Sequence, residues 1–388
     1  MVKYMKSVGI ICEYNPFHNG HLKHLKKVKE LFPDYVVILV MSGHFTERGD
    51  ASIISKWDKT EIALKAGIDL VVELPYFFAS QSSDIFARGA IQILNHLGTE
   101  AVVFGSESDN IESLIEIAKT CTNNKKYDKI VKAYLQEGIN YPTALSKAIY
   151  DLTNKKISKP NDILGISYIK EIIKLNSNMK PVTIKREDNF NDSFLYDNIT
   201  SSTSIRENLK NGFEITTQVP DFVKPYLQKK LHFIDDYFSI LKYKILTCSD
   251  DLYKFQTVDE GIENRIMKFI LHSNSYNEFI LKIKTKRYTY NKLNRMFTHI
   301  LCNFTKEEAN QFYDVEYIRI LGFNSKGRVY LNIIKKELKI PLITNFSNIE
   351  NKMLDLEWRA TCAYASILDS NEATKLIEME YKKAPIIY

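Results

Sequence analysis

The chain has 388 residues, 45% of them hydrophobic and 26% charged, a composition typical of a globular protein with room for two domains. No apolar run approaches the ~20 residues of a membrane-spanning helix, and residues 1–9 show no secretory signal, so we expect a cytoplasmic protein without a membrane partner. Five scattered cysteines without a CxxC pair indicate reduced thiols rather than a disulfide framework. The net charge of +6 permits an anionic partner without requiring one.

The first predicted element is a buried strand over Val8–Cys12, which ends in a turn containing the sequence HNGH. Helical spacing begins at His21, so the chain should run strand, tight turn, helix. Gly20 allows the backbone to approach a ligand closely, and the N-terminus of the helix presents free N–H groups and its positive dipole end. His18 and His21 beside that dipole predict a site for the phosphates of a nucleotide.

Zinc is the alternative ligand for these histidines. Cys12, His24 and His44 are the only further ligands nearby, and they lack the spacing of a metal site. We therefore expect no metal to be held by protein side chains here.

Four more strands alternate with helical segments along the first half of the chain. The strands are predicted at Tyr35–Met41, Asp69–Leu74, Ala101–Phe104 and Pro181–Lys185, with helices at Lys56–Gly67, Asp84–Leu97 and over most of Asn110–Ile173. This alternation predicts an α/β fold with a doubly wound parallel sheet. Polar, glycine-containing loops follow the second and fourth strands, at the carboxyl edge where such folds bind ligands.

Two later positions, Asn161 and Arg186, should face the same edge. Asn161 and Asp162 stand where the N-cap of a helix belongs, and Arg186 directly follows the last of these strands. The segment Ser201–Arg206 then begins a short helix and predicts a second anion site, with plain N-capping as the alternative role of Ser202 and Thr203.

The pattern changes between Gly212 and Val223, so we predict a nucleotide-binding domain over residues 1–215 and a mainly helical domain over 216–388. In the second domain, Lys282–Arg295 is rich in cations and contains no acidic residue. Its charges suit RNA phosphates and its tyrosines suit base stacking, whereas the alternative is a solvated helix face. The RNA-contact candidates are Lys284, Lys286, Arg287, Tyr288, Tyr290 and Arg295. A second basic loop is predicted over Arg319–Arg328.

The turn HNGH and the segment SSTSIR resemble the two signatures of the HIGH-type nucleotidyltransferase superfamily, whose sheet is Rossmann-like. The segments GIICEYNPFHNGHLKHL, MSGHFTERGDASIISKWD, KPNDILGISYIK, TIKRED and KRYTYNKLNR further resemble the tRNA(Met) cytidine acetate ligase family of Gram-positive bacteria. The resemblance implies that ATP contacts Ile11, Cys12, Glu13, Tyr14, Asn15, Pro16, Phe17, His18, Asn19, Gly20, His21, Leu22, Lys23 and His24, together with Gly105, Asn161, Arg186, Ser202 and Thr203.

The resemblance also implies a ligase reaction in two steps. Acetate attacks the α-phosphate of ATP to give acetyl-adenylate and pyrophosphate, and the acetyl group then passes to N4 of the wobble cytidine of elongator tRNA(Met). Mg²⁺ would accompany the nucleotide, and acetyl-CoA would not be used. His18 and His21 would be the catalytic residues, because a carboxylate attacking a phosphate needs cationic and N–H groups to offset the developing charge. Two positions depart from the family pattern, Glu47 in place of Gln and Phe190-Asn191-Asp192 in place of Tyr-His-Asp.

Two other functions are compatible with parts of the sequence. A small-molecule adenylyltransferase would need only the first half of the chain, and the basic, aromatic second half argues against it. A tRNA-binding module with a vestigial nucleotide pocket would not need the intact HNGH. We therefore expect an ATP-dependent enzyme that modifies tRNA(Met).

Overall fold

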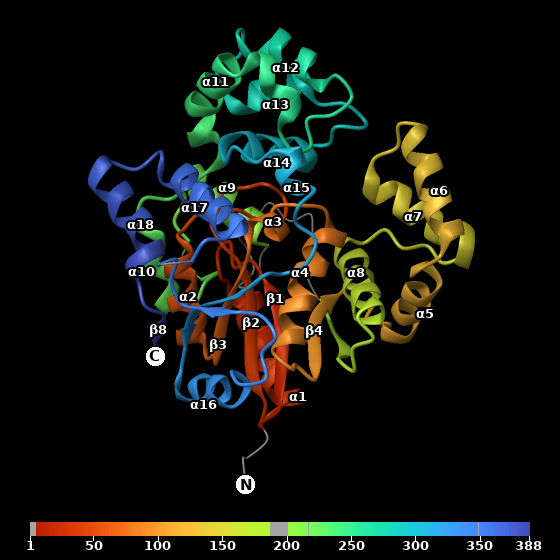
Figure 1. Ribbon diagram of the computed structural model, residues 1–388, viewed down its shortest axis with the longest axis vertical. Helices are drawn as coiled ribbons and strands as arrows, with labels where there is room; N and C mark the ends of the chain where they lie inside the picture. Colours follow the sequence, from red (N-terminus) through yellow and green to blue (C-terminus); the bar gives the residue numbers. More distant parts are fainter. Residues whose placement is uncertain (1–4, 187–200, 216, 348) are drawn as a thin grey trace.

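The computed structural model describes residues 5–186, 201–215, 217–347 and 349–388. The predicted doubly wound sheet is confirmed, with helices on both sides and a helical portion above it (Figure 1). The five predicted strands are present as parallel neighbours in the order β5-β4-β1-β2-β3. Their bounds are β1 Ser7–Cys12, β2 Val36–Ser42, β3 Leu70–Leu74, β4 Ala101–Ser106 and β5 Lys180–Lys185.

The strands form where the sequence has short branched apolar runs, and the middle strands are buried along their length. Every residue of β2 and β3 is buried, as expected of parallel strands covered by helices on both faces. Gly9 in β1 allows a close approach of the helix above it, because a Cβ there would lie 2.5 Å from Leu94 Cδ2. The core of the first half therefore lies between this sheet and its connecting helices.

The helices of the first half agree with the predicted segments, except that the short helix α3 was not predicted. They are α1 Asn19–Leu31, α2 Lys56–Ala66, α3 Tyr76–Ala79, α4 Ser83–His96, α5 Ile111–Cys121, α6 Lys125–Gln136, α7 Tyr141–Thr153, α8 Pro160–Lys174 and α9 Ser202–Lys210. Sequence signals explain the ends of α2, which starts at the N-cap Ser55 and stops at Gly67 in the left-handed conformation, with φ 103°.

The strand order reverses between β1 and β4. From β1 the chain proceeds to β2 and β3 on one side, then crosses back to β4 and β5 on the other. In open α/β sheets the loops on either side of such a reversal diverge, and ligands bind in the crevice between them. The predicted site residues after β1, Glu13 to His18, and near the end of β4, at Gly105, lie on the two sides of this reversal.

The second half of the chain is mainly helical, as predicted, but it also adds three strands to the sheet. Its helical elements are η1 Asp221–Val223, α10 Lys224–Leu227, η2 Ile234–Tyr237, α11 Phe238–Thr247, η3 Ser249–Lys254, α12 Ile262–Ile270, α13 Tyr276–Ile283, α14 Tyr290–Leu301, α15 Lys306–Ala309, α16 Ser325–Ile334, α17 Lys352–Ala365 and α18 Ser370–Lys382. Strand β6 Ile318–Phe323 pairs antiparallel with β3, and β7 Leu342–Ile343 and β8 Ile386–Ile387 pair with β6. The division of the chain after residue 215 stays a prediction, and the sheet takes strands from both sides of it.

The predicted basic loop Arg319–Arg328 is wrong. This segment forms β6 and the start of α16, and Arg319 is fully buried. Its guanidinium contacts Glu73 at 2.8 Å, and Lys56 Nζ contacts Glu73 at 2.6 Å and Glu380 at 2.8 Å. Arginine in a strand between apolar residues forms part of a buried ion network that joins α2 and β3 to β6 and α18.

Two groups of helices stand out from the sheet in Figure 1. Helices α11–α14 lie at the top of the view, and α5–α7 project at its right side. Within the described part of the chain, no helix is both long enough and apolar enough to cross a bilayer.

Candidate active site

The turn after β1 is held in a tight conformation by its own backbone and by a neighbouring loop. Tyr14 is buried and has φ 48°, in the left-handed region that a non-glycine residue adopts only at a cost. The side-chain oxygen of Asn15 accepts a hydrogen bond of 2.8 Å from the N–H of Ile53. This turn carries Pro16 and Phe17 to the start of α1, which begins at Asn19 rather than at His21.

His18 and His21 lie face to face at the N-terminus of α1. His18 is the N-cap, its Nδ1 accepts the N–H of Gly20 at 3.0 Å, and its own N–H donates to Nδ1 of His21 at 3.3 Å. The ring centroids are 3.9 Å apart. Because a backbone N–H can only donate, each Nδ1 must be the acceptor, and the proton of each neutral imidazole resides on Nε2. The turn therefore presents two Nε2–H donors beside the end of the helix dipole.

Burial keeps the imidazole of His21 neutral. The pKa of His21 lies well below its usual value because burial disfavours the charged form, and repulsion from nearby cationic groups, Arg186 among them, adds to the shift. Burial and Arg186 lower the pKa of His24, one turn further along α1, to about 4. The Nε2 atom of His24 is buried without a hydrogen-bond partner among the described residues. Neutral imidazole N–H donors close to the positive charge of Arg186 suit an anionic ligand.

The remaining residues of the predicted ATP segment line the same strand and helix. Ile11 and Cys12 end β1, and burial raises the pKa of the Cys12 thiol to about 12, so it is an inert thiol rather than a nucleophile. Leu22 and Lys23 follow His21 in the first turns of α1. The Asn19 side chain donates to the carbonyl of Thr217 at 2.6 Å, which ties the start of α1 to the chain after α9.

Gly105, Asn161 and Arg186 come together across the crevice, as the sequence predicted of one pocket. Arg186 Nη1 donates to Asn161 Oδ1 at 3.2 Å, and a Cβ at Gly105 would lie 2.9 Å from Arg186 Cγ. Asn161 Nδ2 in turn donates to Glu107 Oε1 at 2.7 Å. Glycine at position 105 is therefore required by the arginine side chain that crosses it, and that arginine reaches the surroundings of His21.

The prediction that Asn161 and Asp162 cap α8 is wrong. Helix α8 begins at Pro160 with Lys159 at the N-cap, so both residues belong to its first turn. The Asp162 carboxylate instead accepts hydrogen bonds from Ser106 Oγ at 2.5 Å and from the N–H of Ser108 at 3.2 Å. Helix α8 starts here because Pro160 favours the first helical position. The Asp162 carboxylate holds the loop after β4 in place.

The short helix α9 is also placed against the turn, but its arginine has a different role from the one expected. Ser201 is the N-cap of α9 and accepts the N–H of Ser204 at 3.1 Å, so capping does not occupy Ser202 or Thr203. Ser202 Oγ lies 3.5 Å from the carbonyl of Pro16. Arg206 Nη1 donates to the carbonyl of Asn15 at 2.8 Å, so this guanidinium stabilises the turn that precedes His18.

A lysine that the sequence did not single out fastens the two central strands at this edge. Lys59 of α2 is fully buried, and its Nζ donates to the carbonyls of Glu13 at 3.1 Å, Ser42 at 2.9 Å and Gly43 at 2.8 Å. Burial lowers the pKa of Lys59 to about 7, a shift that Glu13 partly opposes. Helical spacing alone places this residue on α2, and only the fold reveals that it faces strand ends.

The loop after β2 connects the turn to the second half of the chain. The N–H of Glu47 donates to Glu13 Oε1 at 2.6 Å, and the carbonyl of Glu47 accepts from Arg295 Nη1 at 3.0 Å. Gly49 has φ 77°, and a Cβ there would lie 2.3 Å from the backbone nitrogen of Arg295. Asn294 Nδ2 donates to Asp50 Oδ1 at 2.8 Å. Helix α14 therefore packs directly on this loop.

The structure separates the RNA-contact candidates into exposed and engaged side chains. Lys284 and Lys286 are exposed, and Tyr290 is 39% exposed. Arg287 forms an ion pair with Glu260, and Tyr288 is 5% exposed with Lys292 Nζ 3.9 Å from its ring centroid. With Arg295 held by Glu47, three of the six candidates have protein partners. Position 47, one of the two departures from the family pattern, is thus part of the contact with α14, whereas Phe190, Asn191 and Asp192 lie outside the described residues.

The comparisons with known proteins agree with this geometry. The family model described as HIGH Nucleotidyl Transferase matches residues 5–379. A protein of Geobacillus sp. (strain WCH70) named tRNA(Met) cytidine acetate ligase is 41% identical over 400 residues, covering 99% of this chain and all of that protein. The chain belongs to the tRNA(Met) cytidine acetate ligase family. Another relative of the same name, from Bacillus subtilis (strain 168), is 38% identical over 99% of this chain and 98% of its own.

Solved structures in the same family share the fold. The crystal structure of apo Thermotoga maritima TmcAL superposes with a TM-score of 0.90 at 31% identity, covering 99% of both chains. A second structure of that protein, bound with alpha-thio ATP, gives a TM-score of 0.87 at the same identity and coverage. The tRNA(Met) cytidine acetate ligase family thus matches this chain along its whole length, including the helical second half.

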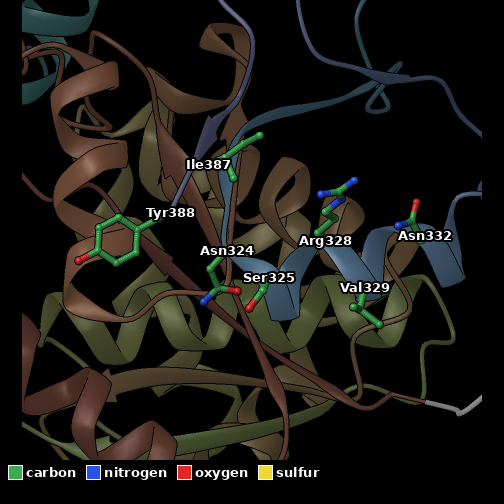
Figure 2. Close-up of a pocket in the computed structure, with 7 residues that line it drawn as sticks. All are labelled: Asn324, Ser325, Arg328, Val329, Asn332, Ile387 and Tyr388. Carbon is green, nitrogen blue, oxygen red and sulfur yellow. The ribbon is translucent and has the colours of Figure 1, made fainter.

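A separate hollow of about 390 Å³ lies at the other end of the sheet (Figure 2). Asn324, Arg328 and Tyr388 are among its lining residues. Because Phe323 pairs with Leu70 at the start of β3, this hollow lies at the amino edge of the parallel strands. It contains none of the predicted site residues, so the crevice between β1 and β4 is the candidate active site.

Proposed function

We propose that this protein activates acetate with ATP and transfers the acetyl group to N4 of the wobble cytidine of elongator tRNA(Met), without acetyl-CoA. Full-length similarity to proteins named tRNA(Met) cytidine acetate ligase supports this function. The observation that carries it is the turn at the N-terminus of α1, where two imidazoles present Nε2–H donors in a protein whose structural relative binds an ATP analogue.

In the first step, an acetate oxygen attacks the α-phosphorus of ATP and the bond to the pyrophosphate oxygen breaks. Negative charge accumulates on the phosphate oxygens of the pentacoordinate transition state. His18 and His21 donate Nε2–H bonds to these oxygens, and the free N–H groups of α1 add to the same field. Acetate is already a nucleophile at neutral pH, so no base is required.

The nucleotide occupies the crevice between the β1 turn and the loop after β4. Arg186, which donates to Asn161, supplies positive charge near His21 and His24. Mg²⁺ would neutralise charge on the β- and γ-phosphates when bound. Oxygen donors are present in Glu13, but its Oε1 already accepts the N–H of Glu47, so we assign the ion to the phosphates without a protein ligand.

In the second step, the cytidine N4 attacks the carbonyl carbon of acetyl-adenylate. A C–N bond forms, the bond from the acyl carbon to the phosphate oxygen of AMP breaks, and one amine proton leaves. The anticodon loop must therefore reach the crevice. Lys284, Lys286 and Tyr290 are exposed on the segment before α14 and at its start. Because α14 packs on the loop after β2, we propose these three side chains as RNA contacts.

Acetate-dependent ATP–pyrophosphate exchange tests this proposal without tRNA. The His21→Ala variant should lose exchange by about 10²–10³, because a donor at the reacting phosphate contributes ~2.7–4 kcal/mol to the transition state. His272→Ala, at an exposed histidine far along the chain, is the matched control and should exchange like the parent.

Exchange in the parent protein that is independent of acetate would indicate an adenylyltransferase for another acceptor. A parent protein that binds tRNA without any exchange would indicate a binding module. Wild-type exchange in His21→Ala would contradict the assigned role of the histidine turn.

A further inference from the structure

We propose that the lysine face of α6 is a second contact for the phosphate backbone of the tRNA, separate from the segment around α14. This inference rests on the proposed function, since it takes the tRNA substrate as the polyanion. Helix α6 carries four lysines and one aspartate in twelve residues, KKYDKIVKAYLQ.

The lysines of α6 are arranged as a face. Tyr127 and Val131 are buried and fix the opposite side of the helix to the protein. Lys125, Lys129 and Lys132 follow one another at i, i+4 and i+7, which places them in a row along one side, and all three are exposed. Side chains in such a row are one helical turn of ~5.4 Å apart, a repeat that can follow successive backbone phosphates.

Within the described part of the chain, no ion pair neutralises these cations. No carboxylate of the described residues forms an ion pair with Lys125, Lys129 or Lys132, although Asp128 lies on the same helix. Lysines nearby behave differently, since Lys155 pairs with Glu116 and Lys170 pairs with Asp84 at 3.2 Å. A row of like charges repels itself on a helix, so its charge is available to an anionic partner.

The row extends toward a hollow of about 350 Å³ between α4, α6, α7 and α8. Lys132 lines this hollow together with Lys170 and Lys174. Lys170 pairs with Asp84 and Lys174 with Glu171, and Asp84 also lines the hollow, so the unpaired positive charge at this place is that of Lys132. The hollow borders α8, whose first turn carries Asn161 of the candidate active site.

The position of α6 separates it from the other RNA candidates. In Figure 1 it lies with α7 at the right side of the molecule, whereas α14 lies below the helices at the top. Arg287 and Arg295 near α14 are engaged by glutamates, so fewer free cations remain there than the sequence predicts. A tRNA with its anticodon loop at the crevice has a long phosphate backbone that the α6 face can bind by charge without reading sequence.

The test is a salt titration of binding by full-length protein to an elongator tRNA(Met) transcript. The variant is Lys125→Gln/Lys129→Gln/Lys132→Gln, which removes charge while keeping good helix formers. If all three contact phosphates, the slope of log affinity against log salt should become shallower by about 2–3, at roughly 0.7–0.9 per contact. Acetate-dependent ATP–pyrophosphate exchange should remain unchanged, because the variant leaves the crevice intact.

The matched control is Lys335→Gln/Lys336→Gln/Lys339→Gln, which removes the same charge from exposed positions after α16. Its slope should equal that of the parent. Equal slopes in the α6 variant and the parent, or equal losses in both variants, would overturn the proposal. The proposal would also be overturned if the α6 variant kept the salt dependence of tRNA binding but lost the parent's binding to vesicles of phosphatidylserine and phosphatidylcholine. That result would assign the α6 face to an anionic membrane. Failure of the parent to bind the transcript would instead refute the proposed function.

Discussion

Replacing Lys59 with methionine should destabilise the protein and damage the mouth of the nucleotide crevice. In the folded state its ammonium group donates to three buried carbonyls, two at the end of β2 and one after β1. Methionine fills a similar volume but leaves these acceptors without a donor. An unsatisfied buried polar group costs ~1–3 kcal/mol. Part of that cost is offset because a charge no longer has to be buried, so we expect a loss of about 3–5 kcal/mol.

This loss converts into a measurable shift in melting temperature. Unfolding entropy near ~2.1 cal/mol/K per residue gives about 0.8 kcal/mol/K for a chain of 388 residues, and hence a decrease of about 4–6 °C. Thermal melts should be run near pH 6, below the pKa of Lys59 at about 7, where the three-donor ammonium form predominates. ATP–pyrophosphate exchange at the same pH should show a raised KM for ATP, because the turn after β1 loses its tie to β2.

Lys65→Met is the control on the same helix. Its side chain is 32% exposed and its ion pair with Glu61 is a surface pair, so its loss should cost at most ~1 kcal/mol. If Lys59→Met melted within about 1 °C of this control and kept the parent KM, the three carbonyl contacts would not stabilise the crevice and the reasoning would fail.

Two more substitutions test neighbouring parts of the structure. Gly105→Ala should raise the KM for ATP in exchange without a large change in melting temperature, because the new Cβ would lie 2.9 Å from Arg186 Cγ and displace that side chain; an unchanged KM would mean that Arg186 does not serve the pocket. Arg319→Met should cost about 3–5 kcal/mol, because Glu73 and Glu380 lose one of their two buried cations and keep only Lys56. Burial raises the pKa of Glu380, but Arg319 and Lys56 outweigh burial and lower that pKa to about 2. The ionised carboxylate therefore stabilises the folded state above its unfolded pKa of about 4.5, and this stabilisation is lost as the pH falls toward 2. Circular dichroism during acid titration should therefore show a smaller loss of stability between those pH values in Arg319→Met than in the parent.

The sequence predicted those parts of the site that depend on local order along the chain. A buried strand, a turn with two histidines and an amphipathic helix must place His18 and His21 at a helix N-terminus, and the structure confirms that arrangement. Parallel strands bring their carboxyl ends to one edge, which is why Gly105, Asn161 and Arg186 could be assigned to one pocket. The order of strand, turn and helix was sufficient for the first inference, whereas the second also depended on the family resemblance.

The sequence did not predict which distant partner each charged side chain would find. Arg319 reads as part of a basic loop because lysine, glycine and arginine follow it, yet its strand pairs with β3 and buries it between Glu73 and Glu380. Tyr288 reads as a stacking residue, and it is buried because α14 and the loop before it close over the ring. Local charge patterns describe one side of an electrostatic contact, and the other side comes from residues hundreds of positions away.

Arg295 illustrates the functional consequence of this difference. As a member of a basic stretch it would contact RNA, and its loss would spare the chemistry of the first half of the chain. In the structure it donates to the carbonyl of Glu47, whose own N–H is bound by Glu13 at the end of β1, so one short chain of hydrogen bonds joins α14 to the nucleotide crevice. Gly49 leaves no space for a side chain against the backbone of α14, so the loop and the helix are in direct backbone contact. RNA at the contacts that we propose beside α14 would therefore lie next to a helix that is hydrogen-bonded, through the loop after β2, to the turn after β1.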